Sequence, residues 1–300
     1  MSVLRCLAPG KVNVCLFVGA PRADGLHPLV SVMQPLSLAD ELTLGPAPAG
    51  ARSDEVACPG VEGPNLASRA LAGFRAATGW DAAPQRLAIA KRVPVAAGMG
   101  GGSADAAGAL RLAGAAAGLA PDAPALSALA PGLGSDVPAA LLARRCLVSG
   151  VGERVELLAD AEAFGILVLP SEAKLSTPSV FAELDRLGGG RAPQELAELE
   201  DAVRSAASSG AALPADLSVN DLEVAARSLC PSIDAALADA RSAGADAAMV
   251  SGSGPTVVAW FHGADGERRA RQACRELVSR HPRAAVAGPV GRGFASPRAA

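Results

Sequence analysis

The sequence predicts a protein of mixed helices and strands that is divided into two domains. At 300 residues and 29.7 kDa, the chain has room for one large domain or two ordinary ones. Segments with the alternating apolar pattern of strands recur between segments with helical spacing. This patterning is weakest at about residues 150–163, so we place the boundary there, between domains of residues 1–152 and 153–300.

The first half begins with strands and ends in alternating elements. Residues 3–19 are predicted to be a strand, because apolar side chains alternate along them. A Gly/Pro/Asp stretch then precedes expected strands at 29–38 and 40–44, a loop at 45–62, a helix at 65–77 and a strand at 87–95. The helix after Ser103 is so rich in alanine that it must be packed on most sides. Short helices at 126–133 and 137–143 and strands at 146–149 and 155–157 follow.

The second half reads as a buried strand followed by mostly helical segments. The strand spans 164–169, and helices are expected at about 178–187, 194–208, 221–229 and 231–243. Strands at 247–250 and 255–261 bracket a Ser-Gly-Ser-Gly turn. A helix at 265–280 and a short strand near 284–290 complete the prediction.

Composition excludes several classes of protein. Hydrophobic residues make up 50% of the chain, 68 of them alanines, and charged residues only 19%, which excludes disorder for the bulk of the chain. A net charge of −3 gives no basic surface for nucleic acid, so any anionic substrate must meet a local positive field. The apolar stretches are broken by Gly, Pro or charge, and we expect no membrane partner.

Cysteine usage and the first residues indicate a cytoplasmic protein. The six cysteines are far apart in the sequence and form no C-x-x-C pair, so we expect reduced thiols rather than disulfides or a zinc site. The first 13 residues lack the apolar segment of a signal peptide.

A glycine-rich segment at residues 94–110 is the most informative part of the sequence. Glycines at 98 and 100–102 leave a strand-to-helix turn without side chains, so that a ligand can approach the backbone. Ser103 stands where a helix N-cap is expected, and free N–H groups at a helix start suit phosphate. No Gly-Lys-Ser/Thr closes the loop, and Ser103 replaces the last glycine of a dinucleotide fingerprint. The alternative is a tight turn or flexible linker.

Two further residues are candidates for chemistry. Lys11 lies in an apolar strand and would be costly there without an anionic partner, although a solvated lysine at a sheet edge is the alternative. We expect Lys11, Asn13 and Cys15 to share one strand face. Asp136 precedes an apolar helix with Pro138 in its first turn, so it is either a helix cap or a residue that meets the glycine loop.

Three segments together resemble the GHMP kinase superfamily of small-molecule kinases. They are Pro9-Gly10-Lys11-Val12-Asn13, the loop from Pro94 to Ala104, and Ser251-Gly252-Ser253-Gly254, in the order and spacing of that superfamily. Further segments are similar to those of its members that act on 4-diphosphocytidyl-2-C-methyl-D-erythritol: RADGLH at 22–27, GGG at 100–102, LGSDVP at 133–138, STP at 176–178 with Phe181, and NDLE at 220–223. The chain departs from these members at Leu26, where an aromatic residue is usual, and at APGK, where they have P-A-K.

The resemblance implies a two-domain α+β GHMP kinase fold, with a ribosomal-S5-like N-terminal domain and a ferredoxin-like C-terminal domain. It implies transfer of the γ-phosphoryl group of ATP, with Mg²⁺, to the 2-hydroxyl of this small-molecule substrate. Asp136 would accept the hydroxyl proton and Lys11 would stabilise the transferring phosphoryl group. No protein ligand to a metal and no oligomeric state is predicted.

The resemblance also assigns binding residues. The cytidyl substrate would contact Asn13, His27 and Phe181. ATP would contact Asn65, Pro94, Val95, Ala96, Ala97, Gly98, Met99, Gly100, Gly101, Gly102, Ser103 and Ala104. The alternatives are another kinase of the superfamily, of homoserine or mevalonate type, and a nucleotide-binding relative without turnover.

Overall fold

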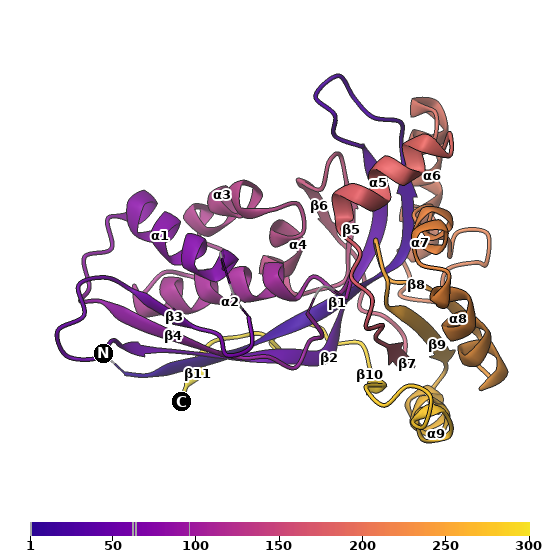
Figure 1. Ribbon diagram of the computed structural model, residues 1–300. Helices are drawn as coiled ribbons and strands as arrows, with labels where there is room; N and C mark the ends of the chain where they lie inside the picture. Colours follow the sequence, from indigo (N-terminus) through magenta and orange to yellow (C-terminus); the bar gives the residue numbers. More distant parts are fainter. Residues whose placement is uncertain (1, 62, 64, 96) are drawn as a thin grey trace.

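The computed structural model describes residues 2–300 apart from 62, 64 and 96. Two sheets with flanking helices form an L-shaped molecule, and the mixed α and β architecture predicted from the sequence is confirmed (Figure 1). Two long antiparallel strands, β1 (Leu4–Val18) and β2 (Leu29–Pro46), run from one arm of the L into the other. They fall where strands were expected, although β2 is continuous through residue 39.

The first arm is a sheet covered on one face by helices. Its strands follow the order β11 (Arg298–Ala299), β1, β2, β4 (Gln85–Ala90) and β3 (Glu55–Ala57), and β2 also pairs with β5 (Cys146–Ser149), which pairs with β6 (Arg154–Leu157). The helices on the covered face are α1 (Leu66–Thr78), α2 (Gly101–Ala116), α3 (Pro124–Leu133) and α4 (Val137–Leu142) (Figure 1).

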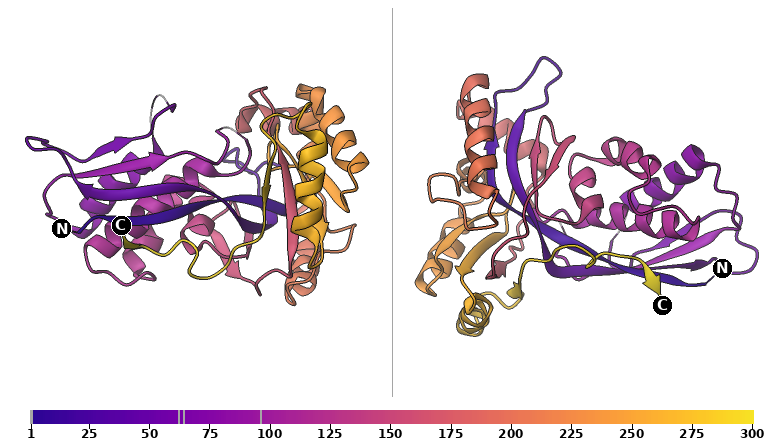
Figure 2. Two further views of the ribbon diagram at one scale, coloured as in Figure 1. Left: turned by 90° about the horizontal axis from the view of Figure 1, so that it is seen from below. Right: turned by 180° about the vertical axis from the view of Figure 1, so that it is seen from behind.

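The second arm holds the smaller sheet. Its order is β10 (Ala285–Ala287), β7 (Phe164–Leu169), β9 (Val257–His262) and β8 (Ala247–Val250), all antiparallel. The helices of this arm are α5 (Thr177–Arg186), α6 (Pro193–Ala207), α7 (Glu223–Leu229), α8 (Ser232–Ser242) and α9 (Gly266–Leu277). After β10 the chain returns along the first sheet, so that both termini lie at the same end of the molecule (Figure 2).

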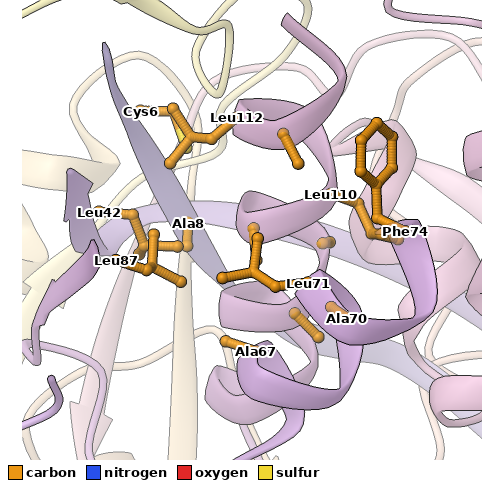
Figure 3. Packing of buried hydrophobic residues seen from close by; sticks show 14 of the residues in the cluster. Cys6, Ala8, Leu42, Ala67, Ala70, Leu71, Phe74, Leu87, Leu110 and Leu112 are labelled. Atoms are coloured by element: carbon orange, nitrogen blue, oxygen red, sulfur yellow. The ribbon is translucent and has the colours of Figure 1, made fainter. Parts of the chain in front are cut away.

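The alanine-rich helix α2 is packed on most sides, as its composition predicted. Every residue from 104 to 114 is buried. The helix lies close to the sheet because the residues on the face that contacts the sheet have small side chains or none. A Cβ at Gly108, for example, would lie 2.7 Å from Cδ2 of Leu42. Figure 3 shows the resulting layer, in which side chains of the sheet, α1 and α2 interdigitate, including Ala8, Leu42, Leu71, Phe74 and Leu110. This packing fixes the start of α2 relative to β1.

Two short strands lie where none was predicted. The segment at 45–62, expected to be a loop, contains β3, and β11 lies beyond the last predicted strand. With three and two residues, both are too short to show the alternation that identifies a strand. Within the residues described, no helix combines the length and the apolar character needed to cross a bilayer.

Candidate active site

A cavity of about 600 Å³ lies where the two arms meet. Its walls come from parts of the chain that are far apart in sequence. They are Lys11 and Asn13 on β1, the glycine-rich loop and the start of α2, the turn at 134–136, the start of α5, and the turn at 252–254. Lys11, Asp136 and the two glycine-rich motifs singled out in the sequence therefore meet at one place.

The glycine-rich loop delivers the beginning of α2 to this cavity. Gly100 has a φ of 64° and occupies the N-cap position, and its carbonyl accepts a hydrogen bond from Ala104 N at 2.9 Å. The prediction that Ser103 caps the helix is wrong, since Ser103 lies within the first turn. Glycine takes positive φ at little cost, so the helix starts directly after Gly100. Gly100 offers no side chain to cap the helix, so within the described part of the chain the first N–H groups of α2 are left for an anion.

The loop is held in place from both arms of the molecule. Lys11 N donates to Met99 O at 2.9 Å, which joins the loop to β1. On the other side, Ser251 Oγ donates to Gly98 O at 3.1 Å. A Cβ at Gly98, whose φ is 70°, would lie only 2.0 Å from Ser251 O. The second glycine motif thus lies against the back of the first, and Gly98 must be glycine for the two to touch.

Lys11 and Asp136 face each other in the cavity. Lys11 Nζ lies 2.8 Å from Asn13 Oδ1 and 3.4 Å from Asp136 Oδ2. The Lys11 side chain is only 15% exposed, which contradicts the alternative of a solvated edge lysine. Asp136 stands at the N-cap position of α4, but its side chain makes no capping hydrogen bond. Its carboxylate faces the lysine instead, so the alternative of a simple helix cap is wrong as well.

The predicted alternation along β1 fails after Asn13. Lys11, Asn13 and Leu16 line the cavity, whereas Cys15 packs on the other face, in a cluster with Phe17. The cause is a register shift between Asn13 and Cys15 in the pairing with β2. An extra residue in a strand exchanges the faces of all side chains that follow it.

Lys91 is a cavity residue that the sequence prediction missed. It follows β4 directly, lines the cavity, and forms ion pairs with Asp40 and with Asp105, the latter at 2.8 Å. A Cβ at Gly101 would lie 3.2 Å from Lys91 Nζ. The ion cluster of Lys91, Asp40 and Asp105 therefore packs against the start of α2 and supports the loop. Burial, with a smaller contribution from Asp40, raises the pKa of Asp105 to about 7 against the opposing effect of Lys91. Lys91 fell inside the strand predicted at 87–95, whereas β4 ends at Ala90. A lysine within an otherwise apolar segment was the available signal, as it was at Lys11.

At the end of the cavity formed by the second arm, Phe181 of α5 lines the wall, and His27 packs against Phe181. The two rings are 4.8 Å apart between centroids and tilted by 42°. His27 Nδ1 lies 3.0 Å from Gly19 O, and since a carbonyl only accepts, this nitrogen carries the proton. His27 Nε2 lies 3.5 Å from Asp185 Oδ2. His27 is not itself among the residues that line the cavity.

Most residues predicted to bind ATP line this cavity. These are Pro94, Val95, Ala97, Gly98, Met99, Gly100, Gly101, Gly102 and Ser103. Ala104 is buried beneath the loop, and Asn65 caps α1 by accepting from Ala67 N at 2.8 Å. The prediction for Ala96 falls outside the described residues.

The NDLE segment has a structural explanation. Asn220 Nδ2 donates to the carbonyls of Val250 and Gly252, both at 2.8 Å, and Glu223 accepts from Val250 N. Asp221 accepts two hydrogen bonds from Arg191. Asn220 and Glu223 thus fix the turn behind the glycine-rich loop, and Asp221 joins this segment to Arg191 and to Val18 N of β1. Leu222 lines the cavity.

Comparison with known proteins agrees with this geometry. Residues 65–144 match the model of the GHMP kinases N terminal domain, and residues 194–281 match that of the GHMP kinases C terminal. A 4-diphosphocytidyl-2-C-methyl-D-erythritol kinase of Streptomyces coelicolor is 44% identical over 83% of this chain and 84% of its own length.

Solved structures agree with the sequence matches. A crystal structure of a 4-(cytidine 5'-diphospho)-2C-methyl-D-erythritol kinase superimposes with a TM-score of 0.74 and 34% identity, covering 96% of this chain and all of the other. A homoserine kinase from Cytophaga hutchinsonii reaches a TM-score of 0.71 at 17% identity, which shows the shared fold alone. The resemblance found in the sequence is thereby confirmed: the chain belongs to the GHMP kinases and, among them, to the family of 4-diphosphocytidyl-2-C-methyl-D-erythritol kinases.

Proposed function

We propose that the protein transfers the γ-phosphoryl group of ATP to the 2-hydroxyl of 4-diphosphocytidyl-2-C-methyl-D-erythritol. The observation that carries this proposal is the pairing of Lys11 with Asp136 in a cavity that also receives the uncapped start of α2. A cation, a carboxylate and an anion-binding helix terminus are the parts that phosphoryl transfer to an alcohol requires. The substrate class is supported by the relatives named above.

The ATP phosphates would lie against the first turn of α2. The glycines at 100–102 leave space for them, and the N–H groups at the helix start would donate to them. Because α2 is buried along most of its length, these donors are fixed before the nucleotide arrives. Preorganised donors of this kind stabilise charge without reorganisation during the reaction.

Asp136 and Lys11 would carry the chemistry. The Asp136 carboxylate accepts the proton of the 2-hydroxyl, the hydroxyl oxygen forms the new bond to the γ-phosphorus, and the bond to the β-phosphate oxygen breaks to release ADP. Lys11 Nζ, held by Asn13 Oδ1 and 3.4 Å from Asp136 Oδ2, would stabilise the charge on the transferring group.

The donor would be the Mg²⁺ complex of ATP. Mg²⁺ is commonly held by one or two carboxylates together with substrate phosphates and waters. Among the residues that the structure describes, Asp136 is the one acidic side chain in the cavity wall, and the Ser103 hydroxyl lies in the same wall. Because Asp136 is paired with Lys11 and is the proposed proton acceptor, the metal would be held mainly by the nucleotide phosphates, with the Ser103 hydroxyl as the wall group that fits it. It would neutralise phosphate charge.

The cytosine end of the substrate would lie toward α5. Phe181 offers a ring face in the cavity wall. His27 donates its Nδ1 proton to Gly19 O and packs behind Phe181, so it would orient the Phe181 ring toward the base. Asn13 would position Lys11. The division into domains at residues 152/153 and a cytoplasmic location remain part of this proposal.

A coupled assay of ADP release tests the proposal. The purified chain is given ATP and Mg²⁺ with the cytidyl substrate, with homoserine or with mevalonate. We expect turnover with the first alone. Turnover only with another alcohol would favour the homoserine or mevalonate alternative, and turnover with none would favour a silent relative.

Asp136→Asn separates chemistry from folding. Loss of the base is expected to lower turnover by about 10²-fold or more. Because the carboxylate makes no capping bond, the melting temperature should stay close to that of the unmodified chain. Full activity with a lowered melting temperature would refute the assignment.

A further inference from the structure

A second, smaller cavity lies on the opposite face of the strand pair that carries Lys11. It measures about 50 Å³, several times the roughly 10–15 Å³ that one water needs. Gln34 lines it and is paired with Val12 across the sheet, so its side chain leaves β2 on the face opposite to Lys11 and Asn13. Arg145, just before β5, and Trp260 of β9 complete its polar wall, so both arms contribute to it.

Three buried polar atoms in this wall lack a hydrogen-bond partner within the described part of the chain. They are Gln34 Oε1, Arg145 Nε and Trp260 Nε1, on residues that are 1%, 3% and 3% exposed. A buried polar group without a partner costs about 1–3 kcal/mol, and such groups are few in native proteins. Three of them around one cavity indicate that something polar occupies it.

The charge of Arg145 determines the sign of that occupant. The terminal nitrogens of Arg145 reach only carbonyls, Ala207 O at 3.4 Å and Ala211 O at 3.3 Å. Across residues 2–300 as described, no carboxylate lies within 4.0 Å of its guanidinium. The neighbouring Cys15 thiol does not compensate, because burial raises its pKa to about 12. A buried cation without a counter-charge is costly, so an anion is favoured.

The carbonyl oxygen of Gln34 narrows the class of anion that the cavity can bind. Gln34 Nε2 donates to Pro35 O at 2.8 Å and to Val290 O at 3.2 Å, which fixes the orientation of the amide. Gln34 Oε1 therefore remains available to accept a hydrogen bond from an occupant of the cavity. The buried part of the wall thus offers a positive charge, two N–H donors and one carbonyl acceptor. Glu162, whose side chain is exposed, adds a carboxylate at the rim that opposes an anion. Chloride or sulfate would be repelled by the carbonyl oxygen, whereas an anion that carries its own O–H can donate to it.

We propose that this cavity binds a small protonated oxyanion, of the hydrogen phosphate or hydrogen carbonate class, at Arg145, Trp260 and Gln34. The ion would receive hydrogen bonds from Arg145 Nε and Trp260 Nε1 and would donate one to Gln34 Oε1. It would join β2, β5 and β9, and so tie the two arms together behind the strand that carries Lys11. This site is independent of the proposed kinase activity.

The two tryptophans of the chain allow a direct test. In the full chain with Trp80→Phe, Trp260 is the remaining tryptophan, and its emission is followed during titration with potassium phosphate, hydrogen carbonate, sulfate or chloride at matched ionic strength. At slightly alkaline pH phosphate carries a proton and sulfate carries none. We expect a saturable change with phosphate or hydrogen carbonate, at concentrations at least about tenfold lower than with sulfate or chloride.

Three variants in the same background locate the site. Arg145→Met removes the charge and should abolish the response. Gln34→Leu removes the acceptor and should abolish the preference for phosphate over sulfate. Glu162→Gln removes a carboxylate from the cavity wall and should strengthen binding. A response that persists in Arg145→Met would come from elsewhere, such as the larger cavity, and would overturn the proposal. The absence of any saturable response, or an unchanged preference in Gln34→Leu, would overturn it too.

Discussion

A single methyl group at Gly100 tests the geometry of the candidate active site most directly. An ideal Cβ at this position would lie 3.0 Å from Lys11 Cε, 3.1 Å from Lys11 Cγ and 3.4 Å from Asp136 Oδ2. The first two separations are tighter than ordinary contacts, so the Lys11 side chain must move by a few tenths of an ångström. Lys11 Nζ is held by Asn13 and faces Asp136, so this movement displaces the ammonium from its position.

The cost of backbone strain can be measured separately, because the chain offers a matched control. Gly100 has a φ of 64°, and Gly79 at the end of α1 has a φ of 66°. No atom of the described residues lies within 4 Å of a Cβ added at Gly79. Alanine in this conformation costs about 1–2 kcal/mol. A smaller gain of about 0.4–1 kcal/mol from the stiffer unfolded chain offsets part of it. Gly79→Ala should therefore lose on the order of 1 kcal/mol of stability with unchanged turnover.

Gly100→Ala should lose at least as much stability and also lose activity. Since a misplacement of about 1 Å can cost 10²-fold in rate, a shift of a few tenths of an ångström should lower kcat by about tenfold. Urea unfolding and steady-state ADP release on both variants provide the comparison. If the two variants lose equal stability and both keep the turnover of the unmodified chain, Gly100 does not position Lys11, and the reasoning is refuted.

Two further substitutions test the support of the loop and the substrate pocket. Burial raises the pKa of Asp105 to about 7. Between about pH 4 and 7 the folded protein therefore keeps a proton on this carboxyl that the unfolded chain has lost. The contribution of Asp105 to the free energy of unfolding falls as the pH rises through this range. In urea unfolding at several pH values, the free energy of unfolding of the unmodified chain should fall by up to about 1.4 kcal/mol per pH unit because of this group, and that of Asp105→Asn should not show this fall. If the free energies of unfolding of the two proteins changed with pH in parallel, the raised pKa of Asp105 would be contradicted. Phe181→Ala should weaken the cytidyl substrate more than ATP in separate binding titrations, and equal weakening would remove Phe181 from the base pocket.

The order of elements was predictable because the chain marks it locally. The buried strand β7 and the helices α5 to α8 lie within a residue or two of their predicted bounds, since apolar spacing and Pro or Gly at their ends suffice to define them. The residues that line the cavity were also found where they form contiguous motifs, as in the glycine-rich loop.

The errors arose where tertiary pairing decides the local structure. Nothing in residues 11–15 marks the bulge that places Cys15 on the far face of β1, because the bulge exists only in the pairing with β2. Ser103 has the chemistry of a cap, but the positive φ of Gly100 starts the helix three residues earlier. Lys91 was missed because its partners, Asp40 and Asp105, come from distant segments.

The charge distribution around the cavity explains how a chain of net charge −3 can serve an anionic nucleotide. Of the two lysines in the cavity wall, Lys91 is already paired with two carboxylates. Lys11 faces one carboxylate, that of Asp136 at 3.4 Å, which balances part of its charge. The positive field available to phosphate therefore comes from the N–H groups at the start of α2 together with the part of the Lys11 charge that remains. Backbone donors exert that field only while the loop keeps its shape, and that shape depends on Gly98 against Ser251 and on Gly100 against Lys11. The glycines of the loop carry no charge themselves, but their conformations fix the position of the α2 N-terminus and hence the direction of its dipole.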